Sequence, residues 1–319
     1  MKPSIPNSPT VSYSNTASST ICVVCGADDK YAMPLAVTAC SILANLDNSQ
    51  TLLLFVIDGG IKEHNKQKIL KSLDLTRCSV EWLKPADDLL KNLKLTRYFS
   101  VAMYYRLLIS ELLPQQIDRA IYLDCDLVVT ANLKELWDTD MDDNYLLAAI
   151  DTDFPYAASG LLNSEKFNIP PDSMYFNSGV LVLDLKKWRA DGIASKIIQF
   201  IDQHPEDLRL PDQDGLNIVL AGQWGELDLR WNQTPFIYKY SSWRDSPFSQ
   251  ETYNNVINDP WIVHFASGFK PWNAYKLKKE YKELFYYYLD MTAWKGWRFT
   301  LLKAIYRKLW RTVFSGDKR

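Results

Sequence analysis

The sequence is short of several features that would assign it to a protein class at once. Its 319 residues contain no apolar run of 18 residues, so we expect no transmembrane helix. The formal net charge of −2 carries no excess of positive charge that would indicate nucleic acid as a partner. The five cysteines are odd in number and scattered, which argues against a disulfide framework and for a reducing compartment. The function must therefore be sought in motifs.

Strand-like and helix-like segments alternate from Thr20 onwards, which predicts repeated β-α-β units. The expected strands cover 20–25, 51–58, 78–83, 119–124 and 145–151, and the expected helices cover 34–46, 62–74 and 100–113. Such repeats predict an α/β fold: a Rossmann-like, mostly parallel sheet with helices on both faces.

The domain boundaries are predicted from composition, since no clean linker is visible. Residues 1–19 are rich in Ser, Pro, Asn and Thr and lack the apolar stretch of a signal peptide, so we expect a flexible leader. We predict one catalytic domain over 20–275 and a C-terminal helical, basic and aromatic extension over 276–319.

Two aspartates, Asp124 and Asp126, interrupt the apolar run RAIYLDCDLVVT, residues 119–130. The apolar residues on both sides of them together look like a buried strand. In an extended chain, side chains two apart share a face, so Asp124 and Asp126 should point the same way and Cys125 the other. Two like charges repel, and burying them without a partner costs roughly several kcal/mol of folding free energy. We therefore expect a divalent metal or a basic side chain between them. Other aspartates also follow predicted strands, and ligands of such sheets bind at those strand ends.

A series of motifs together resembles the family 8 glycosyltransferases, a retaining group that includes lipopolysaccharide galactosyl- and glucosyltransferases. The motifs, in order, are GADDKYAMPL (26–35), YYRL (104–107), YLDCDLVV (122–129), LWDTD (136–140), AAID (148–151), YFNSGVLVLDLKKWR (175–189), DQDGLN (212–217) and IVHFASGFKPW (262–272). One D-x-D is weak evidence, but this ordered set is strong.

The resemblance implies an A-type glycosyltransferase fold, a UDP-sugar donor and a manganese ion, with Mg²⁺ as the alternative. It implies that the metal ligands are Asp124, Asp126 and His264, the last being one of only three histidines. The implied donor-binding residues are Ala27, Asp28, Asp29, Tyr31, Arg106, Asp124, Cys125, Asp126, Asn177, Ser267, Gly268 and Lys270. The implied catalytic residues are Gln213, Asp151 and Asp212.

Gln213 matches the residue that lies beneath the anomeric carbon of the donor sugar. Retention by double displacement needs a carboxylate nucleophile about 5 Å from an acid/base, and an amide is a poor nucleophile. We therefore favour front-face transfer, in which the departing phosphate oxygen accepts the proton of the incoming hydroxyl. Asp214 is the runner-up for a contact to the sugar, and a covalent route remains open.

Two other functions compete with this interpretation. The motif YLDCDLVVT also resembles the strand end of haloacid-dehalogenase-type phosphatases. That family has this motif near the N-terminus of its domain, whereas three predicted strands precede it here. The second alternative is a nucleotide-sugar-binding protein that has lost catalysis.

The acceptor is expected to be a glycan or a lipid-linked molecule. Candidate acceptor loops are 152–173 and the aromatic stretch 230–255. Interpreted as a helix, residues 294–314 carry an apolar stripe beside six positive charges, with no acidic residue from Met291 to Gly316. This pattern is typical of a helix that lies on anionic lipid, so we expect a cytoplasmic protein, peripheral on the inner face of the membrane, with no nucleic-acid partner.

Overall fold

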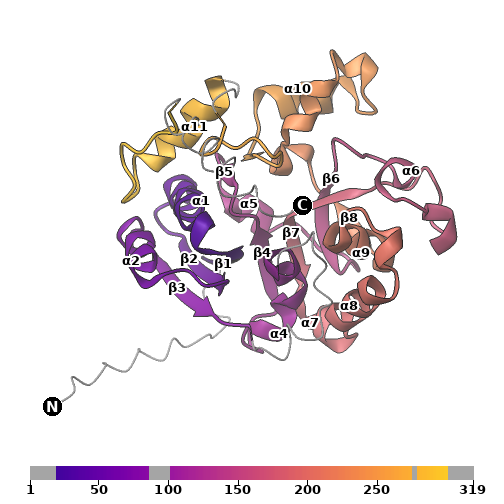
Figure 1. Ribbon diagram of the computed structural model, residues 1–319, viewed down its shortest axis with the longest axis horizontal. Helices are drawn as coiled ribbons and strands as arrows, with labels where there is room; N and C mark the ends of the chain where they lie inside the picture. The colour runs from indigo at the N-terminus through magenta and orange to yellow at the C-terminus, as the bar shows by residue number, and fades with distance from the viewer. Residues whose placement is uncertain (1–18, 86–100, 275–278, 301–319) are drawn as a thin grey trace, which may run out of the picture.

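The computed structural model describes residues 19–85, 101–274 and 279–300, and their arrangement is drawn in Figure 1. The predicted leader lies outside the described residues except for its last residue. Residues 301–319, which make up most of the basic C-terminal segment, lie outside them as well.

A seven-stranded sheet forms the centre of the described part of the chain, in the order β3-β2-β1-β4-β7-β6-β8. The strands are β1 (Thr20–Ala27), β2 (Thr51–Asp58), β3 (Cys78–Leu83), β4 (Arg119–Leu123), β6 (Leu146–Ile150), β7 (Phe176–Asp184) and β8 (Trp224–Glu226). Strand β7 runs antiparallel to both of its neighbours, while the other pairs are parallel. The prediction of a mostly parallel sheet is confirmed, with β7 as the exception.

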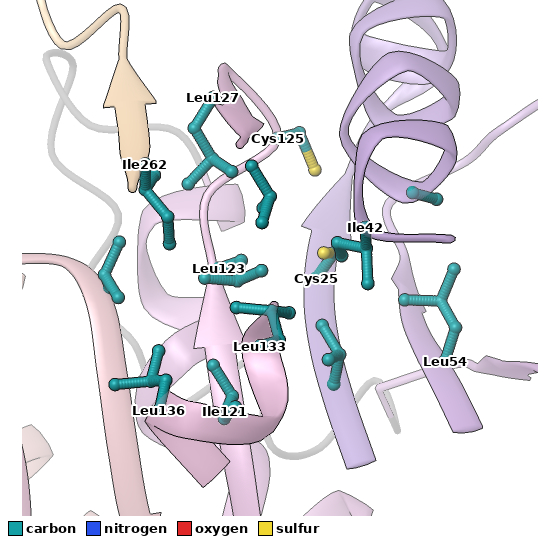
Figure 2. Close-up of a cluster of buried hydrophobic side chains, with 14 of the residues drawn as sticks. Cys25, Ile42, Leu54, Ile121, Leu123, Cys125, Leu127, Leu133, Leu136 and Ile262 are labelled. Carbon is teal, nitrogen blue, oxygen red and sulfur yellow. The ribbon is translucent and has the colours of Figure 1, made fainter. Parts of the chain in front are cut away.

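Helices cover both faces of this sheet, as the alternation of segments predicted. One face packs against α1 (Ala32–Asn45), α2 (Glu63–Lys71), α5 (Leu133–Trp137) and α10 (Gln250–Asn258). The other packs against α4 (Ile109–Leu112), α7 (Leu185–Ala190), α8 (Ile193–Gln203) and α9 (Pro211–Val219). Figure 2 shows part of the first layer, where Leu133 and Leu136 of α5 meet Ile121 and Leu123 of β4. Each such buried aliphatic side chain contributes roughly 1.5–3 kcal/mol relative to exposure.

The predicted strand over 119–124 and the apolar residues after it form two strands rather than one. Strand β4 ends at Leu123, and β5 (Leu127–Val129) pairs antiparallel with β9 (Ile262–His264) in a separate two-stranded sheet. The D-x-D motif therefore lies where the chain leaves one sheet for the other. This change of sheet places Asp124 and Asp126 between the two sheets and aligns Leu127 with His264 in the register of the second sheet.

The expected helix over 100–113 is wrong in type for most of its length. The structure has a 3₁₀ segment, η2 (Val101–Leu108), followed by the single turn of α4. Pro114 ends this stretch, as expected, since proline cannot continue a helix without losing a hydrogen bond.

The C-terminal segment also departs from its prediction. Helix α11 (Lys279–Leu289) packs on β5 and β9 through an aromatic cluster, but residues 294–300 form turns and irregular chain rather than the start of a helix. Trp294 and Trp297 pack against the body of the protein, and Lys68 lies 5.2 Å from the ring centre of Trp294. These two indoles are therefore not part of an exposed apolar stripe.

Candidate active site

A cavity of about 390 Å³ opens at the junction of β4 and β5. It is lined by Arg106, Asp124, Asp126, Asp151, Asp153, Phe154, Asn177, Ser178, Gly179, Leu210, Asp212, Gln213, Phe236, His264 and Ala266. The lining comes from segments more than 100 residues apart, which the sheet order brings to one place. Eight of the residues predicted from the sequence are in it.

Three potential metal ligands meet at one end of the cavity. Ligand atoms of Asp124, Asp126 and His264 all lie within 4.8 Å of one another. His264 Nε2 is 3.3 Å from Asp126 Oδ1 and 3.8 Å from Asp124 Oδ2. Two carboxylates and one imidazole fit a divalent cation that accepts both oxygen and nitrogen ligands.

Gly179 leaves the space that this cluster needs. A Cβ at this position would lie 2.3 Å from His264 Cε1 and 3.0 Å from Asp124 Oδ2. Any other residue would therefore displace the imidazole, which explains why the strand begins Phe-Asn-Ser-Gly.

The hydrogen bonds around His264 fix which ring nitrogen carries its proton. The Gly179 amide donates to the Asn177 side chain (3.0 Å), so the atom that accepts must be the amide oxygen, Oδ1. This oxygen also accepts from Asn232 Nδ2 (2.9 Å). Asn232 Oδ1 is then left facing His264 Nδ1 at 2.9 Å, and an oxygen can only accept there. His264 therefore carries a proton on Nδ1, and Nε2 is the ring nitrogen that faces the two aspartates.

Two cations neutralise the aspartate pair. Arg106 donates from Nη2 to Asp124 Oδ1 (2.8 Å), with its Nε 3.2 Å from Asp212 Oδ2. Lys270 donates to Asp126 Oδ2 and to the carbonyl of Phe265. Burial alone would raise the pKa of Asp126, but the Lys270 ammonium and His264 hold it well below its usual range. The carboxylate pair is thus met by basic side chains, one of the two solutions expected from the sequence.

Asp212 differs from Asp126 in its balance of burial and charge. Burial raises the pKa of Asp212, and the nearby Arg106 guanidinium only partly offsets this effect. For Arg106, burial would lower the pKa, but the field of Asp124 and further acidic groups raises it, so the guanidinium stays charged. The arginine is held in place by Ser178, whose carbonyl (2.7 Å) and hydroxyl (2.5 Å) both accept from Nη1.

The other end of the cavity is organised around the Gln213 amide. Its Oε1 accepts from the Ser178 amide (3.0 Å) and hydroxyl (3.3 Å), which fixes the orientation of the side chain. Its Nε2 donates to Asp151 Oδ2 (3.1 Å) and to the Tyr175 hydroxyl (3.2 Å). Both N–H groups and both lone pairs are engaged, so the protein holds this amide in one rotamer.

Asp214 supports this amide from behind and does not line the cavity. It is fully buried and accepts from the Tyr175 hydroxyl (2.5 Å) and from the backbone amides of Arg209 and Leu210. Because Tyr175 donates to Asp214, its oxygen is free to accept from Gln213. The suggestion that Asp214 contacts the sugar is therefore corrected: it orients Tyr175.

Several predicted donor-binding residues lie outside the cavity lining: Ala27, Asp28, Asp29, Tyr31, Cys125, Ser267, Gly268 and Lys270. Asp28 caps the 3₁₀ turn that follows β1, accepting from the Lys30 and Tyr31 amides. Asp29 is engaged with α2, where it accepts from the Lys62 amide (2.9 Å) and Asn65 (2.7 Å). Cys125 points away from the aspartates, as expected, and its thiol donates to the Gly26 carbonyl (3.2 Å). The donor-binding roles of these residues stay predictions.

The sequence interpretation missed Asn232, Ser178 and Tyr175, and also the cavity residues Phe154 and Phe236. In the aromatic stretch 230–255, the residues expected to stack on sugars are Trp231, Tyr238, Tyr240 and Trp243. Trp231 is instead buried against Trp261, and Tyr238 contacts Tyr281. A phenylalanine in a loop carries no signal that separates a cavity wall from ordinary packing. Ser178 and Tyr175 lie within the motif YFNSG, which could have indicated them.

Comparisons with known proteins decide the family. A model of glycosyl transferase family 8 matches residues 22–276. The chain belongs to this family. It is 34% identical over 275 residues to General stress protein A of Bacillus subtilis. The aligned region covers 85% of this chain and 94% of that protein. It is 28% identical over 279 residues to a lipopolysaccharide 1,2-glucosyltransferase of Escherichia coli, covering 86% and 78%.

The solved structures agree with the family assignment. The galactosyltransferase LgtC, crystallised in complex with donor and acceptor sugar analogs, superimposes with a TM-score of 0.70 at 28% identity, covering 83% of this chain and 95% of that one. The resemblance that the motifs indicated is confirmed, and so is the A-type glycosyltransferase fold. Among the described residues, no helix is long and apolar enough to span a membrane.

Proposed function

We propose that this family 8 protein is a metal-assisted, retaining glycosyltransferase that moves galactose or glucose from a UDP-hexose to a glycan or lipid-linked acceptor. The observation that carries the proposal is the cluster of Asp124, Asp126 and His264, whose ligand atoms meet in the cavity beside Arg106. The hexose is supported by relatives whose names specify glucosyl or galactosyl transfer.

Asp124, Asp126 and His264 would hold the cation, Mn²⁺ in preference to Mg²⁺ because of the imidazole. Bound there, a divalent cation would stabilise the negative charge that develops on the departing diphosphate. Arg106 beside Asp124 and Lys270 beside Asp126 supply positive charge, and the compact ammonium of Lys270 suits a phosphate oxygen.

The hydrogen bonds of Asp151 favour front-face transfer over a covalent route. Its Oδ1 accepts from the Asp153 (2.8 Å) and Phe154 (3.2 Å) amides, and its Oδ2 accepts from Asn177 (3.0 Å) and Gln213 (3.1 Å). Four donors on one carboxylate withdraw its electron density and make it a weak nucleophile. Asp151 and Gln213 then stabilise an oxocarbenium-like state, and the phosphate oxygen accepts the proton of the incoming hydroxyl.

The loop 152–173 supports the choice of acceptor. Asp153 and Phe154 belong to the loop 152–173, so this loop forms one wall where an acceptor sugar would lie.

The basic segment 301–319 keeps the protein on the inner face of the cytoplasmic membrane. Co-sedimentation with anionic vesicles at low salt tests this location: full-length protein should bind, and deletion of 301–319 should release it. Equal binding by both forms contradicts it.

The decisive experiment is hydrolysis of a panel of UDP-sugars with and without Mn²⁺. The proposal expects Mn²⁺-dependent release of UDP from UDP-galactose or UDP-glucose, followed by an α-linked product when an acceptor is supplied. Tight binding of UDP-sugar without turnover would favour a nucleotide-sugar-binding protein. Release of phosphate from phosphomonoesters would favour a phosphatase.

A further inference from the structure

Helix α11 begins after the last residue that the family model matches, residue 276, yet it packs against the segment that carries Lys270. The segment 265–272, which we call the arch, follows β9 and contacts Asp126 through the Phe265 amide and the Lys270 ammonium. Within it, the Phe269 side chain is exposed (69%), while Lys270 next to it is buried (9%) and bonds Asp126. The position of this lysine therefore depends on what holds the two ends of the arch.

Both ends of the arch rest on one ring of α11. Phe285 is buried, and its ring centre lies 6.0 Å from that of Phe265 and 5.1 Å from that of Trp272. The first end is also held by the backbone, since the Phe265 amide donates to the carbonyl of Asp126 (2.8 Å). The second end, directly after Lys270, has no strand partner in the described part of the chain. It is closed by a turn in which Asn273 bonds the Lys270 backbone, and Tyr31 and α11 contact it from other elements.

Tyr286 makes the polar contact at this second end. Its hydroxyl donates to the Pro271 carbonyl (2.9 Å) and accepts from the Phe299 amide (3.1 Å). Arg298 lies 4.5 Å from the ring centre and is held by Asp290. The phenol thus joins the arch, α11 and the chain beyond it at a single oxygen atom.

We propose that Tyr286 is a positioning residue for Lys270, so that α11 and the turn after it belong to the donor-phosphate site. Resting on the proposed function, this inference adds a determinant of donor affinity that lies outside the family's matched region. Loss of the phenol oxygen frees Pro271 and lets the lysine leave the position from which it neutralises the diphosphate.

The test compares Tyr286→Phe with Tyr288→Phe, a matched control on the same helix. The Tyr288 hydroxyl accepts a hydrogen bond from Asn45 (2.9 Å), so the control also loses one bond to α11, but none to the arch. The first readout is hydrogen exchange of the ligand-free protein at the amides of Asn273 and Ala274, which donate to the Lys270 carbonyl. Tyr286→Phe should speed this exchange roughly three- to tenfold, the effect of one lost hydrogen bond.

The second readout is the Kd for UDP in the presence of Mn²⁺, measured by calorimetry. Tyr286→Phe should raise it roughly three- to tenfold, Tyr288→Phe should leave it unchanged, and Tyr286→Phe should have no further effect in a Lys270→Met background. Unchanged exchange in Tyr286→Phe, or equal effects of both variants, overturns the inference. If wild-type protein binds no UDP while the exchange still responds to Tyr286→Phe alone, the proposed function fails and the positioning of the arch stands.

Discussion

The two ends of the cavity are built from different chemistry. At the metal end, Asp124 and Asp126 are balanced by Arg106 and Lys270, and the contacts are between full charges. At the amide end, Gln213 is held by neutral groups of Ser178 and Tyr175 together with one carboxylate. Coulombic attraction between full charges falls off slowly with distance, whereas a hydrogen bond fails within a fraction of an ångström.

The two ends are nevertheless one network. His264 bonds Asn232, Asn232 bonds Asn177, and Asn177 bonds the same Asp151 oxygen that accepts from Gln213. The charged end is therefore expected to tolerate small shifts but not the loss of a charge. The amide end is expected to tolerate neither a shortened side chain nor a missing hydrogen-bond partner, although the loss of activity should be smaller there.

The largest effect is expected from the loss of a charge at the metal end. Asp126→Asn removes one anionic ligand and leaves the Lys270 ammonium without its partner, so Mn²⁺ affinity and turnover should fall on the order of 10²-fold or more. Mn²⁺ titration by electron paramagnetic resonance and UDP-hexose hydrolysis measure both. Asp207→Asn is the matched control, since that buried carboxylate also bonds a lysine, Lys166, away from the cavity. Wild-type turnover of Asp126→Asn in Mn²⁺ would remove the metal assignment.

A smaller effect, of another kind, is expected at the amide end. Gln213→Ala should lower kcat on the order of 10²-fold with little change in the KM for the donor, because the proposed contact strengthens in the transition state. Mn²⁺ affinity should not change, which separates the two ends. The exposed Gln223→Ala serves as the control. A rise in KM at constant kcat would mean that Gln213 only binds the donor.

The sequence predicts the elements and ligands of this site better than it predicts their support. Asp124, Asp126, His264 and Gln213 were found because the motifs of the resemblance contain them, and the order of strands placed them at one edge. Asn232 was missed because its role arises from a contact between segments 32 residues apart, to which no local pattern corresponds. The break after Leu123 was missed for a similar reason. Apolar residues on both sides of the motif read as one strand, and only the pairing of β5 with β9 separates them.

The finest test of the comparison concerns Tyr175, which touches Gln213 from the side away from the cavity. Tyr175→Phe keeps the ring in its buried position but removes the hydroxyl between Gln213 and Asp214. One N–H of Gln213 then lacks its acceptor, and we expect kcat to fall roughly three- to tenfold at an unchanged KM and unchanged Mn²⁺ affinity.

Tyr145→Phe is the control for this last variant, because it also deletes a tyrosine–aspartate hydrogen bond, from Tyr145 to Asp191 (2.8 Å), on the exposed surface. Burial raises the pKa of Asp214, so without its tyrosine partner this carboxyl should take up a proton more readily than in the wild type. The neutral acid cannot restore the acceptor that Gln213 has lost, since Tyr175 separates the two side chains. If kcat is unchanged in Tyr175→Phe while Gln213→Ala is impaired, Ser178 and Asp151 alone hold the amide. The amide end then tolerates the loss of one hydrogen-bond partner, just as the metal end is expected to tolerate a small shift.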